Sequence, residues 1–157
     1  MRERLQWTPM AEDNVDCTAP SEPGKPGLRF QVVNPEPFAS VQDYKILLND
    51  WPYGLEPGIT HLVVWLKQRL ETDPKRGGDL TTVARRQVEA FVQNVVQNQV
   101  DRFQPTDNTD RVQWFKNWTT IQSVPGLEHI HVLIRDVGNE LVAGLTARPA
   151  QTDESPV

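Results

Sequence analysis

The residues best suited to chemistry lie towards the C-terminal end, where His129 and His131 form an H-x-H alternation within an apolar run. Residues two apart in a strand point to the same face, so a strand here would project both imidazoles together. A neutral imidazole is a competent nucleophile or base near pH 7, provided that its other nitrogen donates to a fixed acceptor. Side chains that could bind an anion lie a few residues upstream: Lys116, Asn117, Gln122 and Ser123.

Two alternatives apply to this motif. An H-x-H pair on a strand can be purely structural, with both rings buried and hydrogen-bonded. A metal site formed with His61, and with Glu128 or Asp50 nearby, is the lesser alternative, because Glu128 should point to the opposite face of the strand. We therefore expect no metal and no cofactor. His61 opens an apolar run, and we interpret it as a buried, hydrogen-bonded residue rather than a ligand.

Aromatic residues stand beside two of the candidate polar positions. Trp51 and Tyr53 flank a proline in a turn, where they could stack on a planar ligand or cover the edge of the core. On a strand through residues 112–118, Trp114 and Lys116 share one face and Phe115 and Asn117 share the other. One of these faces must be core, and the pattern leaves open which one.

The elements that would position these residues follow from periodicity and turn signals. The sequence predicts one main helix over about 82–102, with Thr81 or Thr82 as N-cap and apolar residues at helical spacing. The predicted strands are Leu28–Val33, Tyr44–Asn49, Ile59–Leu66, Val112–Trp118 and His129–Arg135. The order of strands and helix indicates an α+β fold, an antiparallel sheet with the helix packed on one face.

Composition separates a central domain from both ends of the chain. We expect a single α+β domain over residues 28–146, preceded by a flexible or loosely docked N-terminal tail, 1–27, that is rich in proline. Residues 147–157 are expected to be a disordered C-terminal tail. The 157 residues are enough to bury a sizeable core.

Charge and cysteine content exclude several classes of partner. The net charge of −5, with no block of Lys or Arg, argues against binding duplex nucleic acid, which depends on phosphate neutralisation. Cys17 is the single cysteine and cannot form an internal disulfide, which fits a reducing compartment. No apolar run is long enough to span a membrane, and we expect no membrane partner. These features favour a cytoplasmic protein.

Two long segments carry a resemblance to a known family. The sequence DYKILLNDWPYGLEPGITHLVVWLK, followed by VQWFKNWTTIQSVPGLEHIHVLIRDV, resembles the fungal N-acetylglucosamine-induced protein 1 family, a group of unknown biochemical activity. The likeness covers about residues 30–137. Members of the family usually carry a longer helical segment ahead of this region, where this chain has its proline-rich tail.

A more distant resemblance is chemically richer. The order of Asp-x-x, Gly-x-x-His before an apolar strand, a helix, and then Asn, Gln-Ser and His-x-His is similar to the histidine triad (HIT) superfamily. This resemblance implies a HIT-like sheet, with Asp50 in the place that contacts a ribose. His129 would be the nucleophile and His131 the last triad member, whereas the first triad histidine is absent and its position falls near Leu127. The residues lining a phosphate site would be Asn117, Gln122 and Ser123.

Three functions follow from these features. The first is an enzyme acting on a phosphate-containing or nucleotide-like small molecule, with His129 and His131 catalytic. The second is a fungal natural-product (secondary-metabolism) enzyme that uses the same pocket for acid/base catalysis of a condensation, cyclisation or isomerisation. The third is a non-catalytic regulatory module in the response to amino sugars. The expected partner is a small-molecule substrate, with a homodimer possible. The predicted substrate-binding residues are Asp50, Trp51, Tyr53, Lys116, Asn117, Gln122 and Ser123.

Overall fold

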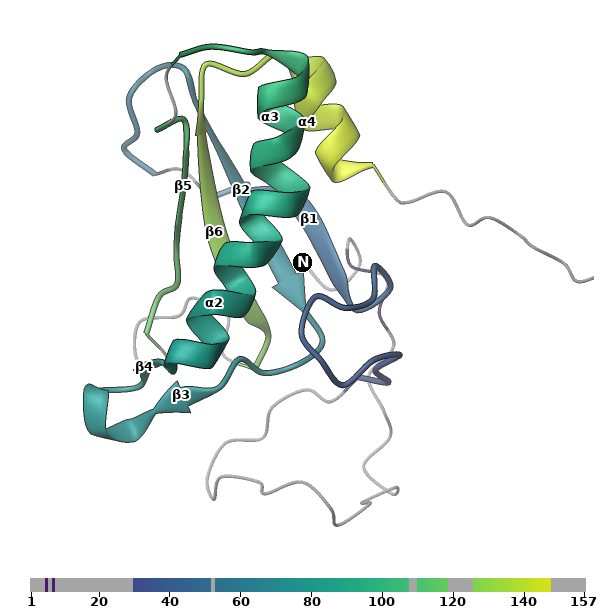
Figure 1. Cartoon of the computed structure of the whole chain (residues 1–157), viewed down its shortest axis with the longest axis vertical. Coiled ribbons are helices and arrows are strands. Elements are labelled where there is room, and N and C mark those ends of the chain that lie inside the picture. The colour runs from purple at the N-terminus through teal and green to yellow at the C-terminus, as the bar shows by residue number, and fades with distance from the viewer. Residues whose placement is uncertain are drawn as a thin grey trace, which may run out of the picture.

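The computed structural model describes residues 5, 7, 30–51, 53–107, 110–118 and 126–147. They form an α+β fold in which a four-stranded sheet is covered on one face by helices (Figure 1). Along the chain the elements are β1 Tyr44–Leu48, β2 Ile59–Leu66, β3 Thr72–Asp73, η1 Pro74–Arg76, β4 Asp79–Leu80, α2 Thr82–Phe91, η2 Val92–Gln97, α3 Asn98–Phe103, β5 Val112–Phe115, β6 Glu128–Arg135 and α4 Asn139–Thr146. The prediction of an antiparallel sheet with one main helix is confirmed.

The sheet has the order β1-β2-β6-β5, and every neighbouring pair is antiparallel. Strands β2 and β6 are the longest and lie at the centre, with Val63 opposite His131 and Trp65 opposite His129. Their runs of β-branched and other apolar residues suit a strand that is covered on both faces. The register therefore places the H-x-H motif in the middle of the sheet.

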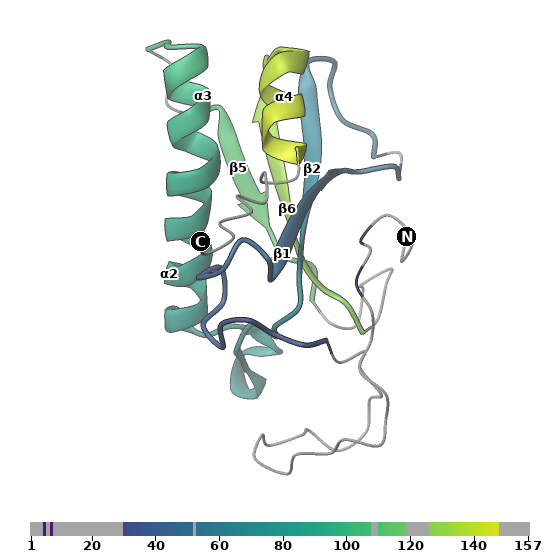
Figure 2. The same ribbon diagram turned by 90° about the vertical axis from the view of Figure 1, so that its right-hand side faces the viewer.

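The main helix runs continuously from α2 through η2 to α3 (Figure 2). Thr81 is its N-cap, with Oγ1 accepting a hydrogen bond from the Ala84 backbone N–H at 3.2 Å. The predicted span of about 82–102 is confirmed to within one residue. Its central six residues, Val92–Gln97, form a π-helical segment that the periodicity did not predict.

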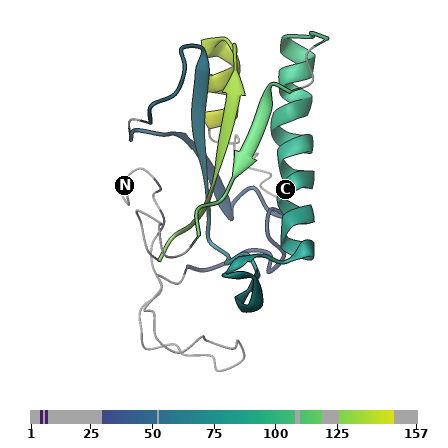
Figure 3. The same cartoon turned by 90° about the vertical axis from the view of Figure 1, so that its left-hand side faces the viewer.

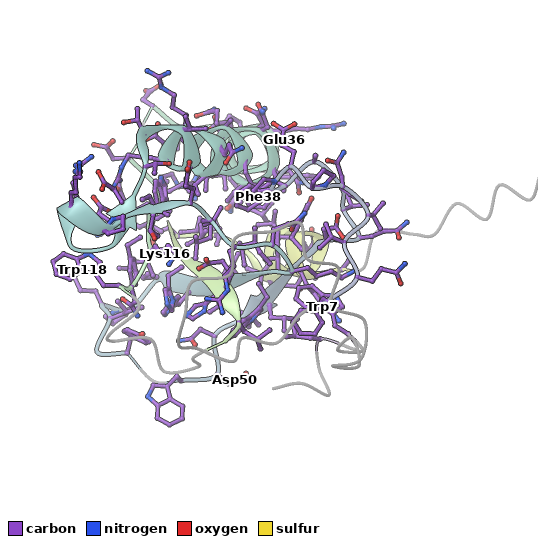
Figure 4. All side chains as sticks on the ribbon, turned by 90° about the horizontal axis from the view of Figure 1, so that it is seen from below. Trp7, Glu36, Phe38, Asp50, Lys116 and Trp118 are labelled. Carbon is purple, nitrogen blue, oxygen red and sulfur yellow. The ribbon has the colours of Figure 1, made fainter. Side chains whose placement is uncertain are left out.

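Alternate residues of β2 and β6 face two different layers. On the side that we call the helix face, Leu62, Val64, Ile130, Val132 and Ile134 have no exposed surface and pack against the main helix and α4. On the opposite side, which we call the histidine face, Val63 and Trp65 pack with Leu5, Phe30, Leu47 and Leu127. In Figure 4, Phe38 lies on the helix side of the sheet, and Trp7 and Asp50 lie on the other side.

Leu5 and Trp7 lie outside the predicted domain of 28–146 yet pack on the histidine face. Leu5 is buried, the Trp7 ring lies edge-on to Phe30 at 5.4 Å, and the Lys67 ammonium lies 5.7 Å from the Trp7 ring centre. Figure 3 shows the sheet edge-on, with the main helix along one of its sides. Most of the predicted tails, 8–29 and 148–157, lie outside the described residues.

Several predicted elements need correction. The strand expected at Leu28–Val33 is wrong in its described part, because Phe30 forms a single bridge and residues 31–33 belong to no strand. The backbone N–H groups of Val33 and Asn34 donate to the buried Asp43 carboxylate at 2.8–3.0 Å, so they are not available to a strand partner. The strand expected at Val112–Trp118 ends at Phe115. The β3–β4 hairpin and α4 were not predicted.

Candidate functional site

The three histidines of the chain come together on the histidine face. His61 lies on β2, and His129 and His131 lie on β6, all projecting from the side of the sheet opposite the main helix. His61 pairs across the strands with Leu133, which places it diagonally beside His131. The prediction that His129 and His131 share a face is confirmed, since their ring centres lie 5.2 Å apart.

A chain of hydrogen bonds joins Asn49, His61 and His131. The Asn49 Nδ2 atom lies 3.0 Å from His61 Nδ1, and His61 Nε2 lies 2.9 Å from His131 Nδ1. On the far side of this chain, His131 Nε2 lies 3.5 Å from Asn117 Nδ2. His61 is buried and hydrogen-bonded, as predicted, but its partner is the H-x-H motif itself. This partnership makes His61 part of the candidate site.

His129 is held separately from this chain. Its Nδ1 lies 3.0 Å from the backbone carbonyl oxygen of Leu127, and its ring lies 4.7 Å from the Trp65 ring. Because a carbonyl oxygen only accepts hydrogen bonds, Nδ1 must carry the proton of the neutral imidazole. The Nε2 atom of His129 is therefore the nitrogen with a free lone pair, as a nucleophile or base requires.

Aromatic rings position the imidazoles. Phe115 stacks on His131 with ring centres 4.6 Å apart and planes only 8° from parallel. Tyr53 meets His61 edge to face at 4.7 Å and lies 6.0 Å from His131. Phe115 and Asn117 thus lie on the histidine face, which answers the question of strand faces that the sequence left open.

Burial keeps the histidines uncharged. It lowers the pKa of His61 and of His129 below the ordinary value of 6.5, in His129 despite the Leu127 hydrogen bond and the nearby Glu128, which raise it. For His131, burial together with the neighbouring His129 and His61 lowers the pKa to about 4. All three rings are consequently neutral near pH 7, the form in which imidazole acts as nucleophile, base or hydrogen-bond donor.

Six of the seven predicted substrate-binding residues fall into three groups. Tyr53 and Asn117 contact the histidines directly, while Asp50 and Trp51 follow Asn49 on an exposed turn, where 74% of Trp51 is accessible. Gln122 and Ser123 lie outside the described residues. Their assignment to substrate binding stays a prediction.

Lys116 is placed apart from the histidine face. Its Nζ lies 3.0 Å from Glu128 Oε1, and both side chains are buried, with 7% and 4% of their surface exposed. Glu128 Oε2 also accepts a hydrogen bond from the Leu70 backbone N–H at 3.0 Å. Glu128 points away from His129, as predicted, and the Lys116 ammonium is directed to it rather than to a site beside the imidazoles.

Three residues of the site were missed or undervalued by sequence reasoning. Asn49 was read only as the end of a strand, His61 as a structural residue and Phe115 as an undecided strand position. The signal for Asn49 and His61 was their place at facing ends of β1 and β2, where the Asn49 backbone N–H donates to the His61 carbonyl oxygen.

Among the described residues, no group of three or more His, Cys, Asp or Glu is arranged to hold a metal ion. In the same ranges, no helix has both the length and the apolar character needed to cross a bilayer.

Comparison with known proteins supports the first resemblance. The chain is 29% identical over 106 residues to N-acetylglucosamine-induced protein 1 of Candida albicans, covering 67% of this chain and 39% of that protein. It is 35% identical over 98 residues to the uncharacterized protein YPL067C of Saccharomyces cerevisiae, covering 62% of this chain and 46% of the relative. The chain thus spans less than half the length of these two relatives.

A solved structure and a family model agree with these relatives. The structure described as "Crystal Structure of HTC1" is similar with a TM-score of 0.53 and 33% identity, covering 69% of this chain and 58% of that chain. A family model described as "Protein of unknown function (DUF3605)" matches residues 1–135. The chain therefore belongs to the DUF3605 family, the group of the N-acetylglucosamine-induced protein 1 of Candida.

Proposed function

We propose that the protein is an enzyme acting on a small phosphate-containing or nucleotide-like molecule, with His129 as nucleophile and His131 as a hydrogen-bond donor. The observation that carries this proposal is the hydrogen bond between His129 Nδ1 and the Leu127 carbonyl oxygen. It fixes the neutral ring with its lone pair at Nε2, as an attacking nitrogen requires. Burial further favours this neutral form.

The reaction can be written with these residues. His129 Nε2 attacks phosphorus, a nitrogen–phosphorus bond forms, and the bond from phosphorus to the leaving oxygen breaks as that group departs with a proton from solvent. Water then attacks the phosphorus of the phosphorylated histidine, the nitrogen–phosphorus bond breaks, and phosphate and a proton are released to solvent as the free imidazole is restored. The developing negative charge on the phosphoryl oxygens needs donors aimed at it. His131 is one such donor, and Gln122 and Ser123 are the further donors that the HIT resemblance implies.

Leu127 lies near the place of the first triad histidine, which this chain lacks. In the HIT resemblance the first triad histidine falls near Leu127, whose side chain has no polar atom. Here Leu127 contributes its backbone carbonyl instead, and any residue type could supply that group. The orientation of His129 therefore depends on the path of the backbone before β6, so the missing side chain does not remove the means of holding the nucleophile.

A second function is acid/base catalysis on a substrate of little charge, such as the condensation, cyclisation or isomerisation of a fungal natural product. The buried Lys116–Glu128 pair favours it, because it directs the nearest predicted cation away from the histidines. Neutral rings that offer a lone pair at His129 and a donor at His131 suit proton transfer equally well. A regulatory, non-catalytic role in the response to amino sugars is the third alternative, suggested by the name of the Candida relative. A cytoplasmic location and a homodimer stay predictions.

Intact-protein mass spectrometry after incubation with a panel of nucleotides and sugar nucleotides tests the first function. We expect a phosphate-bearing adduct on the wild type and none on His129→Ala. Arg135→Ala is the matched control, since Arg135 ends the same strand, is exposed and pairs with Glu56. It should form the adduct as the wild type does. An adduct that persists in His129→Ala would assign the nucleophile elsewhere. Absence of any adduct or thermal stabilisation in the wild type would favour the second function.

A further inference from the structure

The Asn49 side chain is held in one orientation by the backbone of Trp51. Asn49 Nδ2 donates to the Trp51 carbonyl oxygen at 2.6 Å, and Asn49 Oδ1 accepts from the Trp51 N–H at 3.3 Å. Rotating the amide by half a turn would set nitrogen against the N–H and oxygen against the carbonyl, so both contacts would become repulsive. The amide nitrogen is therefore the atom that faces His61.

This orientation determines which nitrogen of His61 carries a proton. Asn49 Nδ2 has two hydrogens, of which one goes to Trp51 and the other points to His61 Nδ1, 3.0 Å away. Because an amide nitrogen only donates, His61 Nδ1 must accept. In the neutral ring the proton then lies on Nε2.

The same reasoning passes to His131. His61 Nε2–H points to His131 Nδ1 at 2.9 Å, so Nδ1 of His131 accepts and its proton lies on Nε2. We propose that Asn49 is a positioning residue that sets the tautomers of His61 and His131 and makes His131 present an N–H at Nε2. The inference rests on the proposed function in one respect: this N–H is the group that would donate to a substrate oxygen beside His129.

The two histidines of the motif thus hold opposite tautomers. His129 is protonated at Nδ1 by its contact with Leu127, and His131 is protonated at Nε2 through Asn49 and His61. His129 offers a lone pair at its Nε2, and His131 offers a proton at its own Nε2. A nucleophile beside a donor needs this complementary arrangement, and two rings of the same tautomer would not supply it.

The shorter of the two polar contacts of His131 favours an N–H at Nε2. Phe115 stacks on the ring face and leaves its edge atoms to polar partners. The Asn117 amide nitrogen lies 3.5 Å from Nε2, at the limit of hydrogen-bond distance, so the 2.9 Å contact of Nδ1 with His61 decides which nitrogen of His131 carries the proton. A substrate oxygen bound beside Nε2 would accept a hydrogen bond from this N–H.

The test is long-range nitrogen–proton NMR of the histidine rings in the full chain, which distinguishes protonated from unprotonated ring nitrogens. In the wild type at neutral pH, we expect His131 and His61 to be protonated at Nε2 and His129 at Nδ1. A wild-type spectrum in which His131 carries its proton on Nδ1 would overturn the proposal without any variant being needed.

Asn49→Asp sharpens the test because it keeps the shape of the side chain and removes its N–H donors. Measured above the pH at which the histidines titrate, the carboxylate can only accept, so His61 should move its proton to Nδ1 and His131 should lose the proton at Nε2. Asn94→Asp is the matched control, since Asn94 is exposed on the main helix, on the other side of the sheet. It should leave all three tautomers as in the wild type. Unchanged tautomers in Asn49→Asp, or the same change in Asn94→Asp, would overturn the proposal.

The spectra separate this inference from the proposed function. If the wild type forms no phosphate adduct but shows the expected tautomers, the enzymatic proposal fails and the role of Asn49 stands. If an adduct forms in the wild type, Asn49→Asp should form it about 10²-fold more slowly, as for the loss of one donor to a transition state. An adduct formed at the wild-type rate by a variant with reversed tautomers would show that the His131 N–H is not used.

Discussion

The helix face and the histidine face of the sheet are built from the same two central strands and differ in what they bury. The helix face buries aliphatic residues of β2 and β6 against one long helix and α4. The histidine face buries three imidazoles, each with a hydrogen-bond partner, beside a smaller apolar cluster. Burying polar groups costs free energy unless every one is satisfied, and an aliphatic face is the simpler way to stabilise a sheet.

This difference is the reason for placing the candidate site on the histidine face. The helix face contains the larger apolar cluster and contributes to the stability of the fold mainly through non-directional apolar contact, which needs no special geometry. The histidine face contains directed interactions that reach from Asn49 on the turn after β1 to Asn117 after β5. Departures from the locally simplest choice of residue are expected at functional sites. The comparison can be tested by variants on each face, and the four that follow are ordered by expected effect.

The largest effect is expected from Lys116→Met at the edge of the helix face. It leaves the buried Glu128 carboxylate without its cation, and breaking a buried ion pair in this way costs about 3–5 kcal/mol. Urea denaturation measures the free energy of unfolding. The double variant Lys116→Met/Glu128→Gln removes the orphaned charge and keeps an acceptor for the Leu70 N–H, so it should be more stable than the single variant. A single-variant cost below about 1 kcal/mol, typical of exposed pairs, would contradict a buried pair.

The next effect is a dependence of stability on pH that arises from His131 on the histidine face. The pKa of His131 is about 4 in the folded protein, below the ordinary 6.5 of an unfolded chain. Between these values the unfolded state binds the extra proton, so the free energy of unfolding falls as the pH falls and is fully regained above 6.5. This difference between the two pKa values corresponds to a change of about 3 kcal/mol in the free energy of unfolding.

His131→Asn isolates this contribution. Acidic side chains also lose charge at low pH, so the measured quantity is the difference between wild type and variant in urea denaturation at pH 7 and near pH 4. The variant should lose less stability than the wild type over this range. Equal losses would mean that His131 is not held neutral in the folded protein.

A smaller effect compares neighbours on one strand that point to opposite faces. Val64 has no exposed surface on the helix face, and Val63 is 3% exposed on the histidine face. Val64→Ala should cost about 2 kcal/mol through lost burial and a residual cavity. Val63→Ala should cost about 1 kcal/mol, because the cover around Leu5 and Trp7 is a thin layer that can relax into the space. Equal costs in urea denaturation would show that the two faces are equally well packed.

The sequence predicts the sheet better than it predicts the site. Alternation and turn signals located β1, β2 and β6, and helical spacing located the main helix to within one residue at its end. The β3–β4 hairpin and α4 were missed because strands of two residues and a helix of eight containing Gly144 carry little periodic signal. The π-helical segment depends on packing rather than on local preference.

For the site, a period of two sufficed to place His129 and His131 together. It could not place His61 beside them, because the two partners of the His61–His131 bond are 70 residues apart and meet only through the register of β2 and β6. Lys116 points to Glu128 because its side of β5 faces the helix. Alternation along the strand could not predict this, since it is the same whichever face of β5 meets the helix. Residue types therefore suggested the candidate chemistry, whereas tertiary pairing determined which residues lie together.

The smallest effect is expected from Thr81→Ala, which acts on the helix layer alone. Thr81 Oγ1 accepts from the Ala84 N–H at 3.2 Å and lies 3.1 Å from Glu71 Oε2, so the variant should lose about 1 kcal/mol of stability, as for other N-caps. The ring signals of His61, His129 and His131 should keep their wild-type positions in NMR spectra, because the sheet separates them from this helix end. A shift of those signals without unfolding would show that the two faces are coupled, and the histidine face could then no longer be treated as independent of the packing that stabilises the fold.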